Sequence, residues 1–205
     1  MAVQSRGNSP KDKQSFSVRL PNDELNSILA QVEEETENSN LRECIHFTTG
    51  VLHRIERQMT LGCFLVADTR LILNDLDPAL IKALPVQPKC FLDNPQVVQH
   101  AATKRLTRAE VAMEIAMSLP GPKIMIIGSA PMALRQLIAM HHQTPLIETT
   151  VIAAVTGFAN VVELKEQTWD SGIPGIVVRG RNGGPNTAIA ITNALLRHAV
   201  DKVER

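Results

Sequence analysis

The feature that most constrains this chain is a run of aliphatic residues that breaks into a glycine loop and then opens a helix. It occurs twice, as KIMIIGSAPM over residues 123–132 and as GIVVRGRNGGPN over residues 175–186. A crossing from strand to helix leaves unpaired backbone N–H groups and the positive end of the helix dipole at the sheet edge, which favours an anion there. The pattern therefore predicts an α/β fold that holds a carboxylate or phosphate.

Strand and helix patterns alternate along most of the remaining chain. We expect helices at about 23–35, 49–61, 107–117, 132–141, 161–171 and 187–200, and strands at 63–67, 89–92, 123–127, 149–155 and 176–178. This alternation predicts parallel strands joined by right-handed crossovers, with ligands beyond the carboxyl ends of the strands. The residues that fall at such ends are Asp68, Gly128, Gly157 and Arg179.

Composition limits the classes of function. The 205 residues suit one domain, which we expect over residues 16–205 after a disordered tail at 1–15. Basic and acidic residues number 21 each, so no overall field draws the chain to nucleic acid or to a membrane, and no apolar run is long enough to span one. The cysteines and histidines lack metal-binding spacing, so we expect no metal site. The three cysteines suggest no disulfide framework, so we expect a reducing, cytoplasmic setting.

The loop at Gly128 has two other interpretations. Ser129 and Pro131 suit the start of an ordinary, well-capped helix, which most such loops in α/β folds are. Dinucleotide binding is suggested by Glu148, 20 positions after Gly128, but the G-x-G-x-x-G motif is absent and Glu148 precedes its strand. The phosphate-binding P-loop motif is absent as well.

The loop at residues 179–184 places two guanidinium groups beside three glycines. Arg179 and Arg181 could bind a carboxylate, because glycine permits close approach of the backbone and arginine contacts carboxylates in a bidentate manner. A solvated turn is the alternative.

Arg108 is unusual because it stands in the first turn of a helix. Thr107 and Glu110 form a capping box that predicts the helix start. A cation at this place opposes the helix dipole at a cost of about 0.3–1 kcal/mol, which a bound carboxylate would offset. A flexible surface arginine is the alternative.

Together these segments resemble the precorrin-8X methylmutase family of cobalamin biosynthesis. The resemblance runs in order from about Gly62 to Leu196. It rests on Thr107-Arg108, on residues 128–134, on Gly157-Phe158 followed by Glu163 and Lys165, and on residues 179–184. Upstream, Phe47-Thr-Thr-Gly50 resembles the family's F-S-P-G.

The resemblance implies a three-layer α/β/α fold with a mostly parallel sheet, and a homodimer with its site near the subunit interface. It implies a cofactor-free isomerisation that moves a methyl group from C-11 to C-12 of a corrinoid ring. The substrate is an acidic cyclic tetrapyrrole, precorrin-8X or similar, with many acetate and propionate side chains.

The resemblance also assigns site residues. Arg108 corresponds to a substrate-site arginine that we expect to take part in catalysis. The residues expected to bind substrate are Asp68, Thr107, Gly128, Ser129, Ala130, Gly157, Phe158, Arg179, Gly180, Arg181, Gly183 and Gly184.

This chain departs from the family in two places that matter. The family's proposed general acid is the His of a V-I-H-A-[TC]-G motif, and the ungapped match places Glu34 there, whereas His46 lies 12 residues later. The alternative for Glu34, which stands among Glu33, Glu35 and Glu37, is an exposed acidic end of a helix. After Asp68, Thr69-Arg70-Leu71 stand where the family tends to have an acid and Met. The loss of the histidine leaves an alternative open, a non-catalytic relative that binds a tetrapyrrole for transport or regulation.

Overall fold

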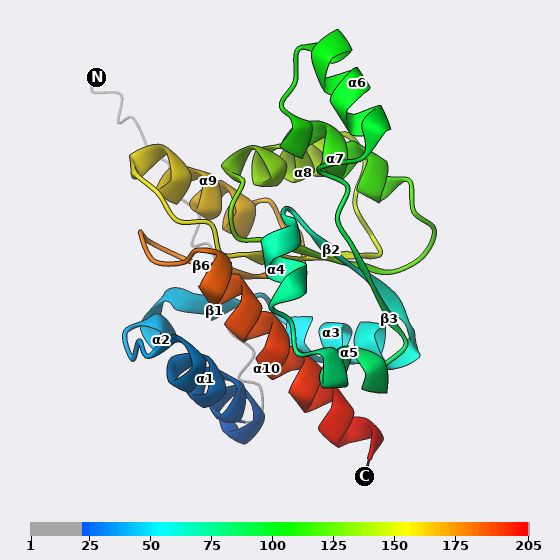
Figure 1. The fold of residues 1–205 in the computed structure, drawn as a ribbon. Helices are drawn as coiled ribbons and strands as arrows, with labels where there is room; N and C mark the ends of the chain where they lie inside the picture. The colour runs from blue at the N-terminus through cyan, green and yellow to red at the C-terminus, as the bar shows by residue number, and fades with distance from the viewer. Residues whose placement is uncertain (1–21, 205) are drawn as a thin grey trace, which may run out of the picture.

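The computed structural model describes residues 22–204, which form one α/β domain (Figure 1). The central sheet has six strands in the order β1-β6-β5-β4-β2-β3. The strands are β1 (Ile45–Phe47), β2 (Cys63–Ala67), β3 (Val86–Lys89), β4 (Lys123–Ile127), β5 (Thr149–Ala153) and β6 (Gly175–Val178). All neighbouring pairs are parallel except β1 with β6, so the predicted mostly parallel sheet is confirmed.

Helices cover both faces of the sheet, as the predicted three-layer fold requires (Figure 1). One layer contains α1 (Asn22–Thr36), α2 (Leu41–Cys44), α3 (Val51–Leu61), α4 (Arg70–Asn74), α5 (Pro78–Ala83) and α10 (Pro185–Val203). The other contains α6 (Pro95–Lys104), α7 (Arg108–Met117), α8 (Pro131–Gln143) and α9 (Ala159–Asp170). No helix among these is long and apolar enough to cross a bilayer.

The central strands separate two hydrophobic cores. Every residue of β4 and β5 is buried, as expected where helices cover both faces of a parallel sheet. Along β4, Ile124 and Ile126 pack into the core with α1 and α10, whereas Met125 and Ile127 pack into the core with α7 and α8. Because both faces of the strand are covered, alternate side chains enter the two cores and residues 124–127 are all apolar.

The predicted capping box at the start of α7 is confirmed. The Glu110 amide donates to Thr107 Oγ1 at 3.3 Å, and the Thr107 amide donates to Glu110 Oε2 at 2.8 Å. This reciprocal pair sets the first turn of α7 and therefore the position of Arg108.

Several elements differ from the sequence prediction. The strand expected at 89–92 is wrong, because the edge strand β3 lies earlier and ends at Lys89. Pro88 lies within β3, where a proline is tolerated because β3 is an edge strand. The antiparallel strand β1 and the short helices α2, α4, α5 and α6 were not predicted. The tail expected at 1–15 lies outside the described residues.

Candidate functional site

The carboxyl edge of the sheet brings the two glycine loops together. A Cβ on Gly128 would lie 2.9 Å from Ala188 Cβ and 3.0 Å from Pro185 Cα, so the loop after β4 touches the first turn of α10. Because α10 follows the loop at residues 179–184, the two segments singled out in the sequence are neighbours at one edge.

The backbone amides at the start of α8 are already engaged by a carboxyl group of the chain itself. Asp68, at the end of β2, accepts hydrogen bonds through Oδ2 from the amides of Ser129 at 2.7 Å and Ala130 at 2.6 Å. The expectation that both donors stand free for a ligand is therefore corrected. The anion-binding character of this helix start was predicted, but its occupant was not.

Asp68 is an unusual carboxyl group. The residue is 1% exposed, and its Oδ1 is buried with no hydrogen-bond partner among residues 22–204. Burial raises the pKa of Asp68 above its ordinary value, although the amides of Ala130, Ser129 and Gly128 act in the opposite direction. Asp68 thus joins β2 to the start of α8 while its ionised form is disfavoured.

Arg108 belongs to a small charged cluster at this edge. Its Nη1 lies 3.8 Å from Oδ1 of Asp93, whose Oδ2 accepts a hydrogen bond from Arg70 Nε at 3.2 Å. Thr69, next to Arg70, has its hydroxyl 3.4 Å from that of Ser129. The structure therefore brings Arg108, Arg70 and the Ser129 loop into one neighbourhood.

The helix that carries Arg108 is anchored from behind. Glu110 is 2% exposed and pairs with Arg135 of α8 as well as with Thr107. Burial raises the pKa of Glu110, but the hydrogen bonds from Thr107 and Arg135 outweigh it, so this pKa lies below its ordinary value. Arg108 consequently projects from a rigid turn.

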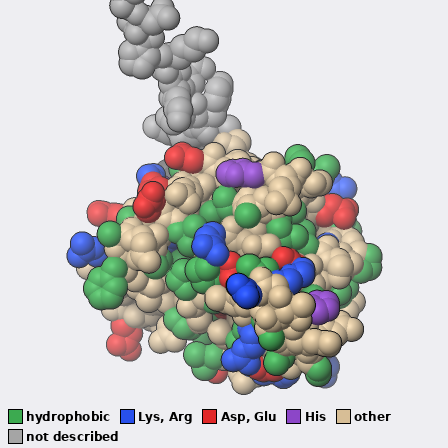
Figure 2. All heavy atoms as spheres, turned by 90° about the horizontal axis from the view of Figure 1, so that it is seen from above, with side chains coloured by type: hydrophobic (Ala, Val, Ile, Leu, Met, Phe, Trp, Pro, Cys, Tyr) green, Lys and Arg blue, Asp and Glu red, His purple; other side chains and the backbone are tan. Residues whose placement is uncertain are grey.

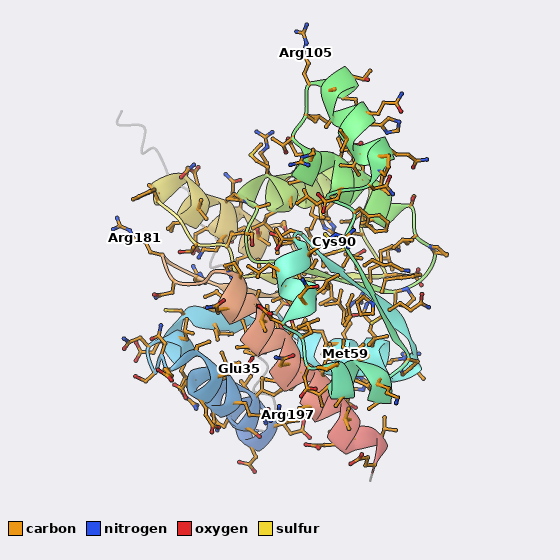
Figure 3. The ribbon with its side chains drawn as sticks, viewed as in Figure 1. Glu35, Met59, Cys90, Arg105, Arg181 and Arg197 are labelled. Atoms are coloured by element: carbon orange, nitrogen blue, oxygen red, sulfur yellow. The ribbon has the colours of Figure 1, made fainter. Side chains whose placement is uncertain are left out.

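The loop after β6 holds its two arginines differently. The Arg179 guanidinium forms an ion pair with Glu166 and lies 5.7 Å from the ring of Trp169, while its amide donates to Cys44 O at 2.7 Å. Arg179 is therefore engaged within the protein, contrary to the expectation of a free guanidinium. The side chain of Arg181 instead extends away from the body of the protein (Figure 3).

A buried lysine supports this loop from beneath. Lys165 is completely buried, and its Nζ donates to Asn182 O at 2.8 Å. Burial lowers the pKa of Lys165 to about 8. Gly183 has a φ of 129° and would place a Cβ 2.2 Å from Ala154 O, so the close approach of the loop to the end of β5 requires glycine. Gly180 and Gly184 also have positive φ angles.

Apolar side chains lie exposed near the same edge. Phe158, at the start of α9, is 86% exposed, and Leu71 of α4 is 52% exposed. Gly157 precedes Phe158 and packs against Val161, with a Cβ position only 2.6 Å from its side chain. These residues offer apolar surface beside the charged groups.

The structure places Glu34 in the opposite layer from Arg108. Glu34 is exposed on α1, where it lines a hollow of about 210 Å³ with Gln31, Glu35 and Arg197. Figure 3 shows Glu35 and Arg197 between the neighbouring helices α1 and α10. That volume is below the roughly 300–1,000 Å³ of typical small-molecule sites. Within this single chain, Glu34 and Arg108 are therefore not brought together.

One backbone angle supports the alignment that placed Glu34. Glu37 has a φ of 51°, in the left-handed region that favours glycine, and the matched motif has glycine at this position. The assignment of Glu34 to the histidine position is consistent with this angle. Its role stays a prediction.

The two histidines nearest in sequence lie in different places. His46 packs edge-on against Trp169 with ring centroids 5.8 Å apart, and burial together with the Arg179 charge lowers its pKa. His53 lines a cavity of about 460 Å³ with Gly62, Pro122 and Glu148, at the ends where β2, β4 and β5 begin. Only His46 is therefore close to the loop at residues 179–184.

Sequence reasoning missed the acidic and aromatic side chains that contact Arg108 and Arg179. Asp93 and Glu166 are distant in sequence from Arg108 and Arg179, and Trp169 adds a stacking contact for Arg179. The Asn94-Pro95 start of α6 could have located the loop that carries Asp93. No comparable local signal indicates Glu166.

Charge on the face seen in Figure 2 is mixed, since Lys and Arg side chains lie among Asp and Glu side chains around the tip of α6. This agrees with the zero net charge of the chain. Among residues 22–204, no group of three or more His, Cys, Asp or Glu side chains is arranged to hold a metal ion.

Comparison with known proteins gives consistent matches. The family model of precorrin-8X methylmutase matches residues 13–198. The cobalt-precorrin-8 methylmutase of Salmonella typhimurium is 30% identical, with 84% of this chain and 80% of that protein covered. The cobalt-precorrin-8 methylmutase of Leptospira interrogans is 32% identical, with 70% and 69% covered.

Solved structures show the same fold. A precorrin-8X methyl mutase from Thermus thermophilus superposes with a TM-score of 0.77 at 26% identity, covering 86% of each chain. A precorrin-8X methylmutase related protein gives a TM-score of 0.79 at 21% identity, covering 89% of this chain and 94% of that one.

Proposed function

Because the chain belongs to the precorrin-8X methylmutase family, we propose that it is an isomerase of cobalamin biosynthesis that moves a methyl group from C-11 to C-12 of a corrinoid ring. The observation that carries this proposal is the family match over residues 13–198. The alternative, a non-catalytic tetrapyrrole-binding relative, is not favoured, since the curated relatives are named for the mutase reaction.

The carboxyl edge supplies the groups that such a substrate needs. Arg108, Arg70 and Arg181 offer guanidinium groups to acetate and propionate arms, and Phe158 offers apolar surface to the flat ring. Asp68 positions the loop of Gly128, Ser129 and Ala130 through its hydrogen bonds.

The remaining members of the proposed binding set shape this edge. They are Thr107, which caps α7, and Gly157, Arg179, Gly180, Gly183 and Gly184, which build the two neighbouring loops. Of these, Arg179 acts by holding its loop against α9 through Glu166.

The proposed substrate is cobalt-precorrin-8, because the two relatives described above at 30% and 32% identity carry that name. Migration of a methyl group within one molecule balances without a second reactant, so a proton that the protein lends to the ring to promote migration must return to the protein in the same cycle. Glu34 is the proposed proton donor, because the ungapped match to the family's histidine motif places it at the position of that histidine. A homodimer in the cytoplasm is proposed on the same basis, and in it Glu34 would act across the subunit interface.

The test is turnover. Purified protein is mixed with cobalt-precorrin-8 and, separately, with metal-free precorrin-8X, and the absorption change of the ring is followed. Conversion of either substrate supports the isomerase, whereas binding of both with unchanged spectra contradicts it.

Glu34→Gln tests the proton donor, and Glu35→Gln, on the same hollow, is the matched control. General acid catalysis contributes about 10²–10⁴ in rate, so kcat should fall by that factor in the first variant alone. An unchanged kcat in Glu34→Gln would remove Glu34 from the mechanism. Sedimentation velocity tests the dimer, and a monomer that still turns over contradicts the shared site.

A further inference from the structure

Two arginines face one aspartate at the rim of the carboxyl edge. Asp93 presents Oδ2 to Arg70 Nε at 3.2 Å and Oδ1 to Arg108 Nη1 at 3.8 Å. The two guanidinium groups thus approach the two oxygens of a single carboxylate, although Arg70 and Arg108 come from different helices. The arrangement places both guanidinium groups beside one carboxylate, Arg70 at hydrogen-bond distance and Arg108 at ion-pair distance.

Both arginines keep N–H groups for a further acceptor. Arg70 is 68% exposed and Arg108 is 55% exposed at the side chain. In the described part of the chain, the contacts of Arg70 to acids involve Nε, and those of Arg108 involve Nη1. Each guanidinium carries five N–H donors, so each retains donors that face solvent.

The electrostatics favour an additional anion. One carboxylate balances only one of the two positive charges, and Arg108 also stands in the first turn of α7, where the helix dipole opposes a cation. Exposed ion pairs contribute only about 0–1 kcal/mol, so the contacts with Asp93 do not lock the arginines against a better partner.

The cluster adjoins the proposed substrate site. Arg70 follows Thr69, whose hydroxyl lies 3.4 Å from that of Ser129, and Thr69 follows the buried Asp68. A carboxylate bound by Arg70 would therefore sit beside the loop that Asp68 positions.

We propose that Arg70 and Arg108 form one carboxylate subsite for an acidic side arm of the corrinoid, with Arg70 as a specificity-determining residue of this chain. The inference rests on the proposed function, because it assigns a part of the same substrate to the cluster. Asp93 spaces the two guanidinium groups in the absence of substrate.

The experiment measures corrinoid affinity through quenching of the single tryptophan, Trp169, in wild type, Arg70→Gln, Arg108→Gln and the double variant. The probe is hydrogenobyrinic acid, the product of the methyl shift in precorrin-8X. Its methyl ester keeps the ring and removes the charges of the side arms, so it serves as the ligand control. Arg57→Gln is the protein control, because Arg57 lines the cavity at the opposite edge and its loss changes the net charge equally.

Loss of a charge-assisted contact should weaken the acid about tenfold in either single variant. Because one carboxylate is shared, the double variant should lose well under the hundredfold that independent sites would give. Arg57→Gln should bind as wild type does, and affinity for the ester should be the same in all variants.

The outcomes separate the two proposals. If wild type binds the acid and Arg70→Gln binds equally well, or if the losses multiply to a hundredfold, the shared subsite is wrong and the isomerase stands. If wild type binds neither hydrogenobyrinic acid nor cobalt-precorrin-8, the proposed function fails and the subsite with it.

Discussion

Replacement of Asp68 by alanine should destabilise the protein far more than replacement by asparagine. Alanine leaves the amides of Ser129 and Ala130, which now donate to Asp68 Oδ2 at 2.7 and 2.6 Å, without their acceptor. Leaving a buried donor unpaired costs about 1–3 kcal/mol, and loss of a helix cap costs about 0.5–2 kcal/mol. We therefore expect Asp68→Ala to lower the free energy of unfolding by about 3 kcal/mol.

Asparagine keeps a carbonyl oxygen at the same position and carries no charge. Asp68→Asn should therefore stay within about 1 kcal/mol of wild type at neutral pH. Because burial raises the pKa of Asp68 in the folded state, wild type should lose stability relative to Asp68→Asn as pH rises through that pKa.

Urea unfolding followed by Trp169 fluorescence and by far-ultraviolet circular dichroism measures these differences. For a chain of this length, a loss of about 3 kcal/mol corresponds to a fall in Tm of about 10 °C. A change below about 0.5 kcal/mol in Asp68→Ala would refute the reasoning, since it would mean that solvent replaces the carboxylate without cost.

Three further changes test other features. Gly128→Ala places a methyl group 2.9 Å from Ala188 Cβ and 3.0 Å from Pro185 Cα, so chemical denaturation should show a loss of about 1–3 kcal/mol. Glu37→Gly relieves a left-handed φ of 51° and should raise the unfolding free energy by up to about 1 kcal/mol, and a loss would contradict the strain. The pKa of Lys165 lies at about 8 in the folded state, below its unfolded value. Wild type should therefore gain stability relative to Lys165→Met between pH 8 and about 10.5, as measured by urea midpoints. A constant difference between the two midpoints across that range would contradict this prediction.

The parts of the fold that were predictable carry local signals. The strand at 123–127 contains the uninterrupted apolar run 124–127 directly before Gly128, and the start of α7 has a complete capping box. α5 and α6 begin at Asp77-Pro78 and Asn94-Pro95, a cap followed by proline in the first turn, so these two helices could also have been found.

The site was less predictable because its contacts join distant segments. The sequence indicates that the start of α8 attracts an anion, but not that Asp68, 61 positions from Ser129, provides it. Likewise, nothing near Arg179 indicates that Glu166 engages it. Such pairings depend on strand order and on the direction of each side chain, which local patterns do not contain.

The antiparallel strand β1 links the order of synthesis to the order of folding. Its residues 45–47 pair with residues 176–178 of β6, and Thr48 and Gly175 add hydrogen bonds beyond the strand. While the chain is still on the ribosome, β1 has no strand to pair with until residues 176–178 of β6 have been made. Closure of such a distant pairing is slow, so the helices α1 and α2 complete their packing only after β6 and α10 are available.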